Sequence, residues 1–131
     1  MRSLTWCPLC LAVALLACMT PAPGEKECTA ACDAQRPCED PSVPPEEVNR
    51  FVEGCIDSCI DEFARADEIS DLCLDSYRNF QICWATLSCT EFSDWVLSPE
   101  SGPCGDAYIE VTEVCEGLTG AQPRLLKKDE L

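Results

Sequence analysis

The cysteines constrain this chain more than any other feature of its sequence. Thirteen occur in 131 residues, and three of them lie in an apolar N-terminal leader: Cys7, Cys10 and Cys18. The even remainder follows the leader: Cys28, Cys32, Cys38, Cys55, Cys59, Cys73, Cys83, Cys89, Cys104 and Cys115. Such density in an exported chain is typical of a disulfide framework formed in an oxidising compartment. We therefore expect every one of these later cysteines to be paired.

The leader predicts export. An apolar run at residues 9–17 follows Arg2. This run is too short to cross a bilayer as a helix but is typical of a signal peptide. No second apolar run follows it in the sequence. We therefore expect no transmembrane span.

Two cleavage sites are compatible with this leader. Ala22 and Gly24 are small residues of the kind that signal peptidase prefers, and they place one cut before Glu25. The sequence LLAC at 15–18 resembles a bacterial lipobox. That pattern places the other cut before Cys18 and makes this cysteine the lipid-bearing N-terminus. If the first cut is used, Cys18 is an ordinary leader residue, and both alternatives stay open.

Proline and glycine divide the chain into a few segments. Turn-rich stretches occur at 36–45 and 98–103. We assign residues 1–24 to a signal peptide and tether, and residues 25–120 to one disulfide-rich helical domain. Residues 121–131 are expected to form a disordered polar tail.

Between these breaks, apolar residues recur every three or four positions, the spacing of a helix that buries one face. One such stripe falls within 46–66: Val48, Phe51, Val52, Cys55, Cys59, Ile60 and Phe63. A second follows it: Ile69, Leu72, Cys73, Tyr77, Phe80, Cys83, Trp84 and Leu87. These stripes predict an all-α fold, a small disulfide-rich helical bundle of about four helices with antiparallel pairing.

Two shorter helices are expected after these. Thr90 is expected to cap the first of them, which carries three apolar residues: Phe92, Trp95 and Val96. The last helix begins near Cys104 and is closed by Gly117 or Gly120. The helix prediction has least support at 108–114, because this segment is rich in residues that favour strands.

Helix geometry predicts how the first cysteines pair. Two sets are each spaced by one helical turn: Cys28 with Cys32, and Cys55 with Cys59. Antiparallel helices would join them as a two-rung ladder: Cys28 to Cys59 and Cys32 to Cys55. Parallel helices would instead join Cys28 to Cys55. The short proline-rich connector favours a hairpin return, and therefore the ladder.

The other six cysteines are expected to form three bridges: Cys73 to Cys115, Cys83 to Cys104, and Cys38 to Cys89. The first two follow from the similar spans that these cysteines cover along two packed helices. An exchange of roles between Cys83 and Cys89 stays open.

The charge of the chain excludes polyanionic partners. Acidic residues number 24 and basic residues 9, which gives a net charge of −15. Nucleic acid and anionic lipid surfaces would repel such a protein. An acidic, solvated surface is typical of an exported soluble domain, and the Asp-x-Asp-x-Asp-Gly loop of a calcium site does not occur in the sequence.

The sequence singles out no residue for catalysis, since a catalytic pair of carboxylates could not be recognised among its 24 acidic residues. It contains no histidine, which removes Ser-His and Cys-His nucleophile pairs. No Cys-x-x-Cys pair follows the leader, so we expect structural disulfides rather than a zinc cluster or a redox centre. Trp84, Trp95 and Tyr108 are expected to pack in the core rather than line a ligand groove. We expect no enzyme activity, cofactor or metal, and an unidentified protein or ligand as partner.

The C-terminus carries a second address. The chain ends in the tetrapeptide that returns soluble proteins to the endoplasmic reticulum: Lys128, Asp129, Glu130 and Leu131. The sequence lacks N-glycosylation acceptors, since neither Asn49 nor Asn79 is followed by the required serine or threonine. This absence favours a bacterial chain, in which the tetrapeptide has no meaning.

The cysteine spacing resembles that of a bacterial family. The order is Cys-x3-Cys-x5-Cys, then Phe-x3-Cys-x3-Cys, then Cys-x9-Cys-x5-Cys followed by Glu91 and Phe92, and finally Cys-x10-Cys. This pattern is similar to small cysteine-rich lipoproteins of myxobacteria-like bacteria, a family without an assigned activity. The resemblance implies a lipid-anchored or secreted protein of the cell envelope with a binding or structural role. The alternative is a folding or thiol-exchange factor of the endoplasmic reticulum lumen.

Overall fold

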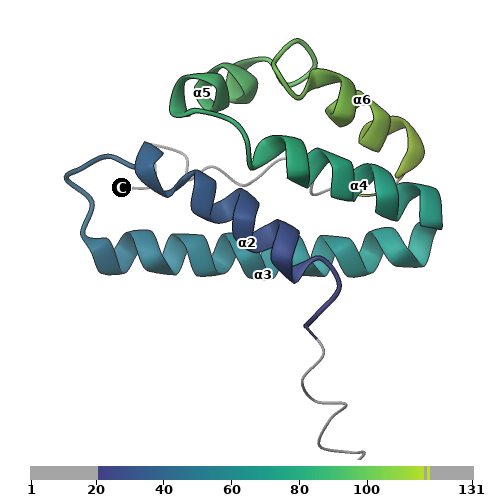
Figure 1. Cartoon of the computed structure of the whole chain (residues 1–131), viewed down its shortest axis with the longest axis horizontal. Coiled ribbons are helices and arrows are strands. Elements are labelled where there is room, and N and C mark those ends of the chain that lie inside the picture. The colour runs from purple at the N-terminus through teal and green to yellow at the C-terminus, as the bar shows by residue number, and fades with distance from the viewer. Residues whose placement is uncertain (1–20, 117, 119–131) are drawn as a thin grey trace, which may run out of the picture.

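The computed structural model describes residues 21–116 and 118, and every regular element among them is helical (Figure 1). In chain order these are α2 (Glu25–Ala34), the 3-10 turn η2 (Arg36–Cys38), α3 (Pro45–Ile69), α4 (Asp71–Trp84), α5 (Cys89–Leu97) and α6 (Gly105–Val114). The predicted all-α, disulfide-rich bundle is confirmed. Five α-helices are present in this part of the chain, close to the predicted four.

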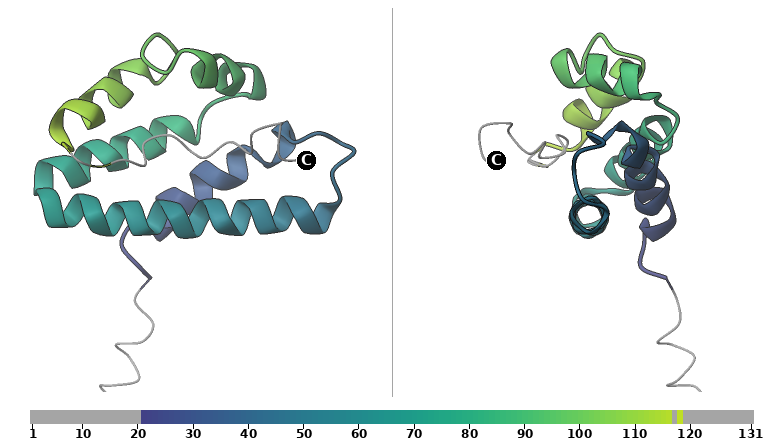
Figure 2. Two further views of the ribbon diagram at one scale, coloured as in Figure 1. Left: turned by 180° about the vertical axis from the view of Figure 1, so that it is seen from behind. Right: turned by 90° about the vertical axis from the view of Figure 1, so that its left-hand side faces the viewer.

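The helices are arranged around α4. It turns back from α3 and runs antiparallel to it, while α2 lies across both of these helices (Figures 1 and 2). On the side of α4 away from α3, the chain continues through α5 and returns along α4 as α6 (Figure 1). α4 therefore packs against three other helices, which explains why its buried face carries three large aromatic side chains, Tyr77, Phe80 and Trp84.

α3 begins and ends at residues whose chemistry suits those positions. Pro45 is its first residue and two acidic residues follow in the first turn, both favourable at a helix N-terminus. The helix continues to Ile69, three residues beyond the end of the predicted segment. Ser70 has an extended backbone and separates α3 from α4. Its side chain accepts a hydrogen bond from the Cys73 backbone N–H at 3.1 Å, which makes Ser70 the N-cap of α4. Ile69 therefore ends α3 instead of beginning the next helix.

The prediction that Thr90 caps α5 is wrong. Ser88 is the N-cap, and its Oγ accepts from the Glu91 backbone N–H at 3.4 Å. Glu91 Oε2 in turn accepts from the Ser88 backbone N–H at 2.9 Å, which completes a capping box. The sequence does contain the signal for this box, a serine followed three residues later by a glutamate. Thr90 lies inside the helix.

The last helix is shorter than predicted. α6 ends at Val114, with Cys115 as its C-cap, so it does not reach the glycines expected to close it. Gly117 and Gly120 lie outside the described residues. Cys115 is bonded to Cys73, and this covalent link fixes the point at which the chain leaves α6. The segment 108–114, rich in strand-favouring residues, is helical, because its face packs on α4.

The core is aromatic and lies between α4 and its neighbours. Its largest fully buried side chains are Trp95, Tyr77, Phe63 and Phe80. Phe63 and Tyr77 meet edge to face across α3 and α4, with ring centroids 4.9 Å apart. Two members of the predicted stripe are not core residues, because Ile69 is 41% and Leu72 60% exposed. Both lie at the turn between α3 and α4, where no described helix covers them.

Candidate functional site

Two disulfides join the first two helices. Cys28 is bonded to Cys59 and Cys32 to Cys55, with Cα–Cα distances of 5.6 Å and 6.0 Å. Each helix contributes two cysteines one turn apart, and α2 runs antiparallel to α3 (Figure 1). The structure thus contains the antiparallel ladder that the spacing predicts, and the parallel alternative does not form.

Three further bridges hold the rest of the described chain: Cys73–Cys115, Cys83–Cys104 and Cys38–Cys89. The first two join α4 to the two ends of α6, as the similar spans along these helices predict. The possible exchange of Cys83 with Cys89 does not occur. Cys83 lies near the end of α4 and reaches Cys104, whereas Cys89 begins α5 beside η2.

The five bridges differ in their burial. Four of them contain at least one cysteine that is nearly inaccessible to solvent: Cys28, Cys32, Cys73 and Cys104. The fifth does not, because Cys89 is exposed and Cys38 half-buried. The Cys38–Cys89 bridge is therefore the most accessible disulfide in the described part of the chain.

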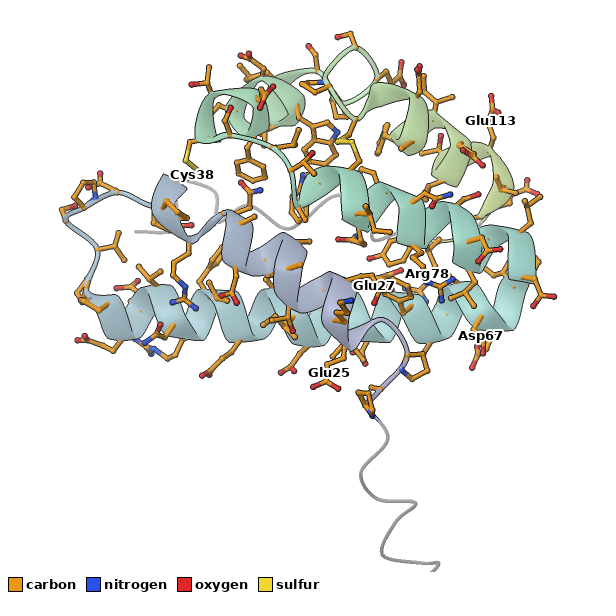
Figure 3. All side chains as sticks on the ribbon, viewed as in Figure 1. Glu25, Glu27, Cys38, Asp67, Arg78 and Glu113 are labelled. Carbon is orange, nitrogen blue, oxygen red and sulfur yellow. A yellow bond between two sulfur atoms is a disulfide. The ribbon has the colours of Figure 1, made fainter. Side chains whose placement is uncertain are left out.

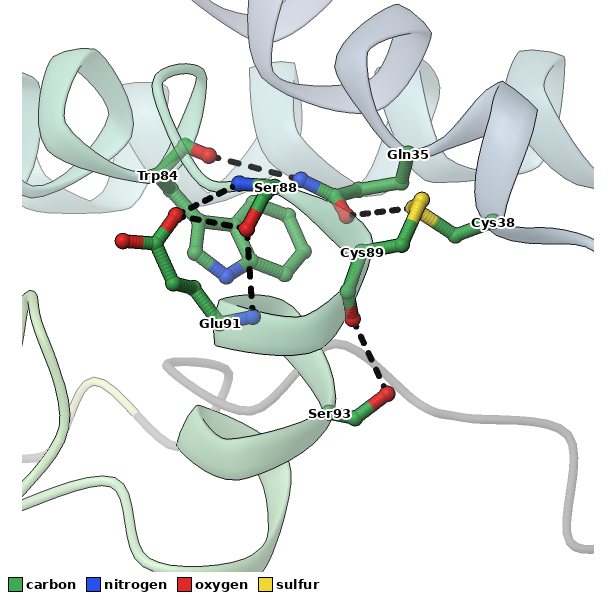
Figure 4. The surroundings of a disulfide bond; sticks show 7 residues. All are labelled: Gln35, Cys38, Trp84, Ser88, Cys89, Glu91 and Ser93. Carbon is green, nitrogen blue, oxygen red and sulfur yellow. Dashed lines mark hydrogen bonds between the residues drawn. A yellow bond between two sulfur atoms is a disulfide. The ribbon is translucent and has the colours of Figure 1, made fainter.

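The surroundings of this bridge are polar (Figure 4). Gln35 Oε1 lies 3.7 Å from Cys38 Sγ, while its Nε2 donates to the Trp84 backbone carbonyl at 3.4 Å. On the other side, Cys89 is the first residue of α5, and its backbone carbonyl accepts from Ser93 Oγ at 3.0 Å. Gln35 thus connects the end of α2 to the end of α4 directly beside the bridge.

The entry of the chain into α2 is packed into the domain. Gly24 has φ 80°, a left-handed conformation that favours glycine, and its carbonyl accepts from the Cys28 N–H at 2.8 Å. A Cβ at this position would collide with the ring of the fully buried Phe63. Ala22 and Glu25 are also joined, because the Ala22 N–H donates to Glu25 Oε2 at 3.1 Å and the Ala22 carbonyl accepts from the Glu25 N–H at 3.0 Å. Residues 22–24 are thus part of the folded domain.

Tyr77 is the most strongly perturbed titratable side chain among those described. Burial and the nearby carboxylate of Glu62 raise the pKa of its hydroxyl far above the usual range, although a hydrogen bond with Gln81 acts in the opposite direction. Burial thus favours the protonated hydroxyl, and Tyr77 serves as a packing residue of the core.

The predicted positions of the large aromatic residues are partly correct. Trp84 and Trp95 are buried core residues, and their rings meet at 5.6 Å. Tyr108 packs its ring edge to face on Trp95 but is only half-buried. It borders an open hollow of about 400 Å³ whose other lining residues form a single loop: Ser98, Pro99, Glu100 and Ser101. The hollow is shallow and polar.

Charged side chains cover the described surface without forming a metal centre. Within the described residues, no three potential ligands among cysteine, aspartate and glutamate converge on one point. Arg78 on α4 lies between two carboxylates, with Glu27 Oε1 at 3.4 Å and Asp75 Oδ1 at 2.8 Å (Figure 3). Screening leaves such exposed pairs weak. The same part of the chain holds no helix long and apolar enough to cross a membrane.

Two sets of predicted site residues lie outside the described part of the chain: Cys18, and Lys128 to Leu131. No protein family, curated protein or solved structure matches this chain. What the structure itself establishes is a small helical domain held by five disulfides, of the kind formed in an oxidising, extracytoplasmic location.

Proposed function

We propose that the mature protein is a lipid-anchored module of a bacterial cell envelope, attached through Cys18 and serving a binding or structural role. The disulfide-held helical domain would then follow the anchored cysteine closely along the chain. Its partner would be a protein or ligand outside the cytoplasm, recognised by the domain's acidic surface.

The observation that carries this proposal is the packing of Gly24. A cut before Glu25 would remove the residue whose carbonyl accepts the Cys28 N–H and would uncover one face of Phe63. It would also place a new ammonium charge at the N-terminus of α2, where the helix dipole disfavours a cation. A cut before Cys18 leaves all of these contacts in place. Of the two cleavage sites in the sequence, the structure therefore favours the lipobox.

The composition of the domain supports a non-catalytic role. The whole sequence lacks histidine, and the cysteines of the described domain are paired in disulfides. The resemblance of the cysteine spacing to small lipoproteins of myxobacteria-like bacteria agrees with an envelope location. The alternative, a protein retrieved to the endoplasmic reticulum by Lys128 to Leu131, needs a soluble chain and therefore a cut that leaves Cys18 without lipid.

The test is to determine the mature N-terminus and its modification. The protein is isolated from its native host after feeding of a labelled fatty acid, and its N-terminal peptide is analysed by mass spectrometry. We expect acylated Cys18 as the first residue and the protein in the membrane fraction. Cys18→Ser should release the protein from the membrane fraction while leaving the five disulfides of the domain formed. An unacylated N-terminus at Glu25 would contradict the proposal.

A further inference from the structure

We propose that the Cys38–Cys89 bridge is a site of thiol–disulfide exchange, opened by an external dithiol while the other four bridges stay closed. The inference rests on the exposure of this bridge, on the position of Cys89 in α5 and on contacts that hold both sides in place. It does not depend on the lipid anchor.

Access is the first requirement for exchange, because the attacking sulfur must reach the disulfide from outside. Cys89 is exposed and Cys38 half-buried, whereas Cys28 and Cys73 are fully buried in the core. The nearest comparisons are Cys32–Cys55 and Cys83–Cys104, in each of which one cysteine is half-buried and the other no more than 2% exposed. An external thiol therefore meets Cys38–Cys89 with the least obstruction.

The second requirement is a stable leaving group. Cys89 is the first residue of α5, whose N-terminal backbone N–H groups and dipole favour a negative charge at that end. The one acidic side chain in that turn, Glu91, already accepts hydrogen bonds from the Ser88 backbone and hydroxyl, at 2.9 Å and 2.7 Å. Cys38 has instead an acceptor beside its sulfur, Gln35 Oε1 at 3.7 Å (Figure 4). This arrangement suits a thiolate on Cys89 and a thiol on Cys38.

The exchange then proceeds in two balanced steps. One thiolate of the dithiol attacks Cys38 Sγ, a new S–S bond forms there, and the electron pair of the old bond leaves on Cys89 as a thiolate. The second thiolate of the dithiol attacks the first sulfur of the same dithiol, which frees Cys38; Cys38 takes up a proton. The protein disulfide is reduced by two electrons, and the dithiol is oxidised to a cyclic disulfide.

The domain is built to stay folded when this bridge opens. On one side, Arg36 within η2 donates to Asp33 Oδ1 at 2.9 Å and to Asn49 Oδ1, which ties the turn to α2 and α3. On the other side, Trp84 packs on Phe92 of α5 with ring centroids 5.4 Å apart. Opening the bridge therefore separates η2 from α5 without removing the contacts that hold either one.

The test uses the oxidised, exported full-length protein. It is exposed to a series of dithiothreitol concentrations, quenched with an alkylating reagent and mapped by peptide mass spectrometry. We expect Cys38 and Cys89 to be labelled at a rate on the order of tenfold higher than Cys83 and Cys104. Far-ultraviolet circular dichroism of the partly reduced protein should be unchanged. If another bridge opens first, if all five open together, or if the helical signal is lost, the proposal is wrong.

A monothiol distinguishes which sulfur is attacked. Reduced glutathione in place of dithiothreitol should give a mixed disulfide that peptide mapping places on Cys38, with Cys89 free for alkylation. Glutathione found on Cys89 would overturn the assignment of the leaving group. The matched control is the double variant Cys38→Ala and Cys89→Ala, which should show no early labelling and an unchanged rate at Cys83–Cys104. A faster opening of Cys83–Cys104 in that variant would show that the bridge protects the fold, contrary to the proposal.

Discussion

At the scale of single residues, glycines show how strongly local conformation depends on neighbours. Gly24 has a left-handed φ and lies directly on the ring of Phe63. Gly54 lies on an exposed face of α3, and a Cβ there would meet nothing within 4 Å. The same residue type is therefore required at the first position and dispensable at the second.

We expect Gly24→Ala to destabilise the domain by about 1–3 kcal/mol, because alanine disfavours this φ and its methyl group would displace Phe63. Gly54→Ala is the matched control, and we expect it to stabilise the helix by about 0.5–1 kcal/mol. The measurement is the free energy of unfolding from urea titration with the disulfides intact. Equal effects of the two substitutions would show that the contact with Phe63 is not made.

At the scale of elements, two helices begin at a serine whose side chain accepts a hydrogen bond from the first turn of that helix. Ser70 ends α3 and caps α4, and Ser88 caps α5. The second cap matters because α5 has only nine residues, too few to be stable in isolation. Its capping box and the packing of Trp95 in the aromatic core together hold it in place.

We expect Ser88→Ala to destabilise the domain by about 1 kcal/mol, because the capping box loses its side-chain acceptor. Thr90→Ala, two residues later and inside the helix, should change the free energy of unfolding by less than about 0.5 kcal/mol. Thermal unfolding followed by circular dichroism measures both. A larger effect of Thr90→Ala than of Ser88→Ala would show that Thr90, and not Ser88, is the N-cap of α5.

The capping box should also depend on pH. Hydrogen bonds from the Ser88 backbone and side chain lower the pKa of Glu91. Because the folded pKa is the lower one, the stabilisation is fully present above the unfolded pKa and is lost as the pH falls through the folded value. We expect the difference in stability between the native protein and Glu91→Gln to shrink on acidification through this range. A difference that grows instead would contradict the assignment.

At the scale of the whole molecule, covalent bonds and an aromatic core share the stabilisation. The ladder between α2 and α3 closes stretches of the chain with sequence separations of 31 and 23 residues. By the loop-entropy account, each such bridge contributes roughly 3 kcal/mol by restricting the unfolded chain. Five bridges therefore rival the total stability of an ordinary domain of this size.

We expect the double variant Cys28→Ser and Cys59→Ser to lose roughly 3 kcal/mol and to keep the Cys32–Cys55 bridge. The second rung persists because α2 and α3 still pack antiparallel and hold these sulfurs opposite one another. Urea titration gives the stability, and peptide mapping under non-reducing conditions gives the pairing. A shuffled bridge between Cys32 and another cysteine would show that the two rungs form only together.

The sequence by itself determined the features that depend on short-range spacing. Cysteines four residues apart share a helix face, and the short proline-rich connector favours a hairpin return; together they predict the antiparallel ladder of Cys28, Cys32, Cys55 and Cys59. The apolar stripe through Tyr77 and Phe80 likewise predicts the buried face of α4. The capping box at Ser88 is also a local pattern of the sequence, a serine followed three residues later by a glutamate, although our prediction places the cap at Thr90.

Only the tertiary structure decided which of these features lie inside and which outside. Leu72 fits the apolar stripe of α4 but is 60% exposed, because no described helix packs over the turn at which it lies. Gly24 looks like a cleavage residue in the sequence, and its role in the fold appears only when Phe63, 39 positions later, is brought against it. Cys89 resembles the other cysteines until packing leaves it exposed. Burial depends on contacts between segments far apart in the chain, and local spacing cannot specify those contacts.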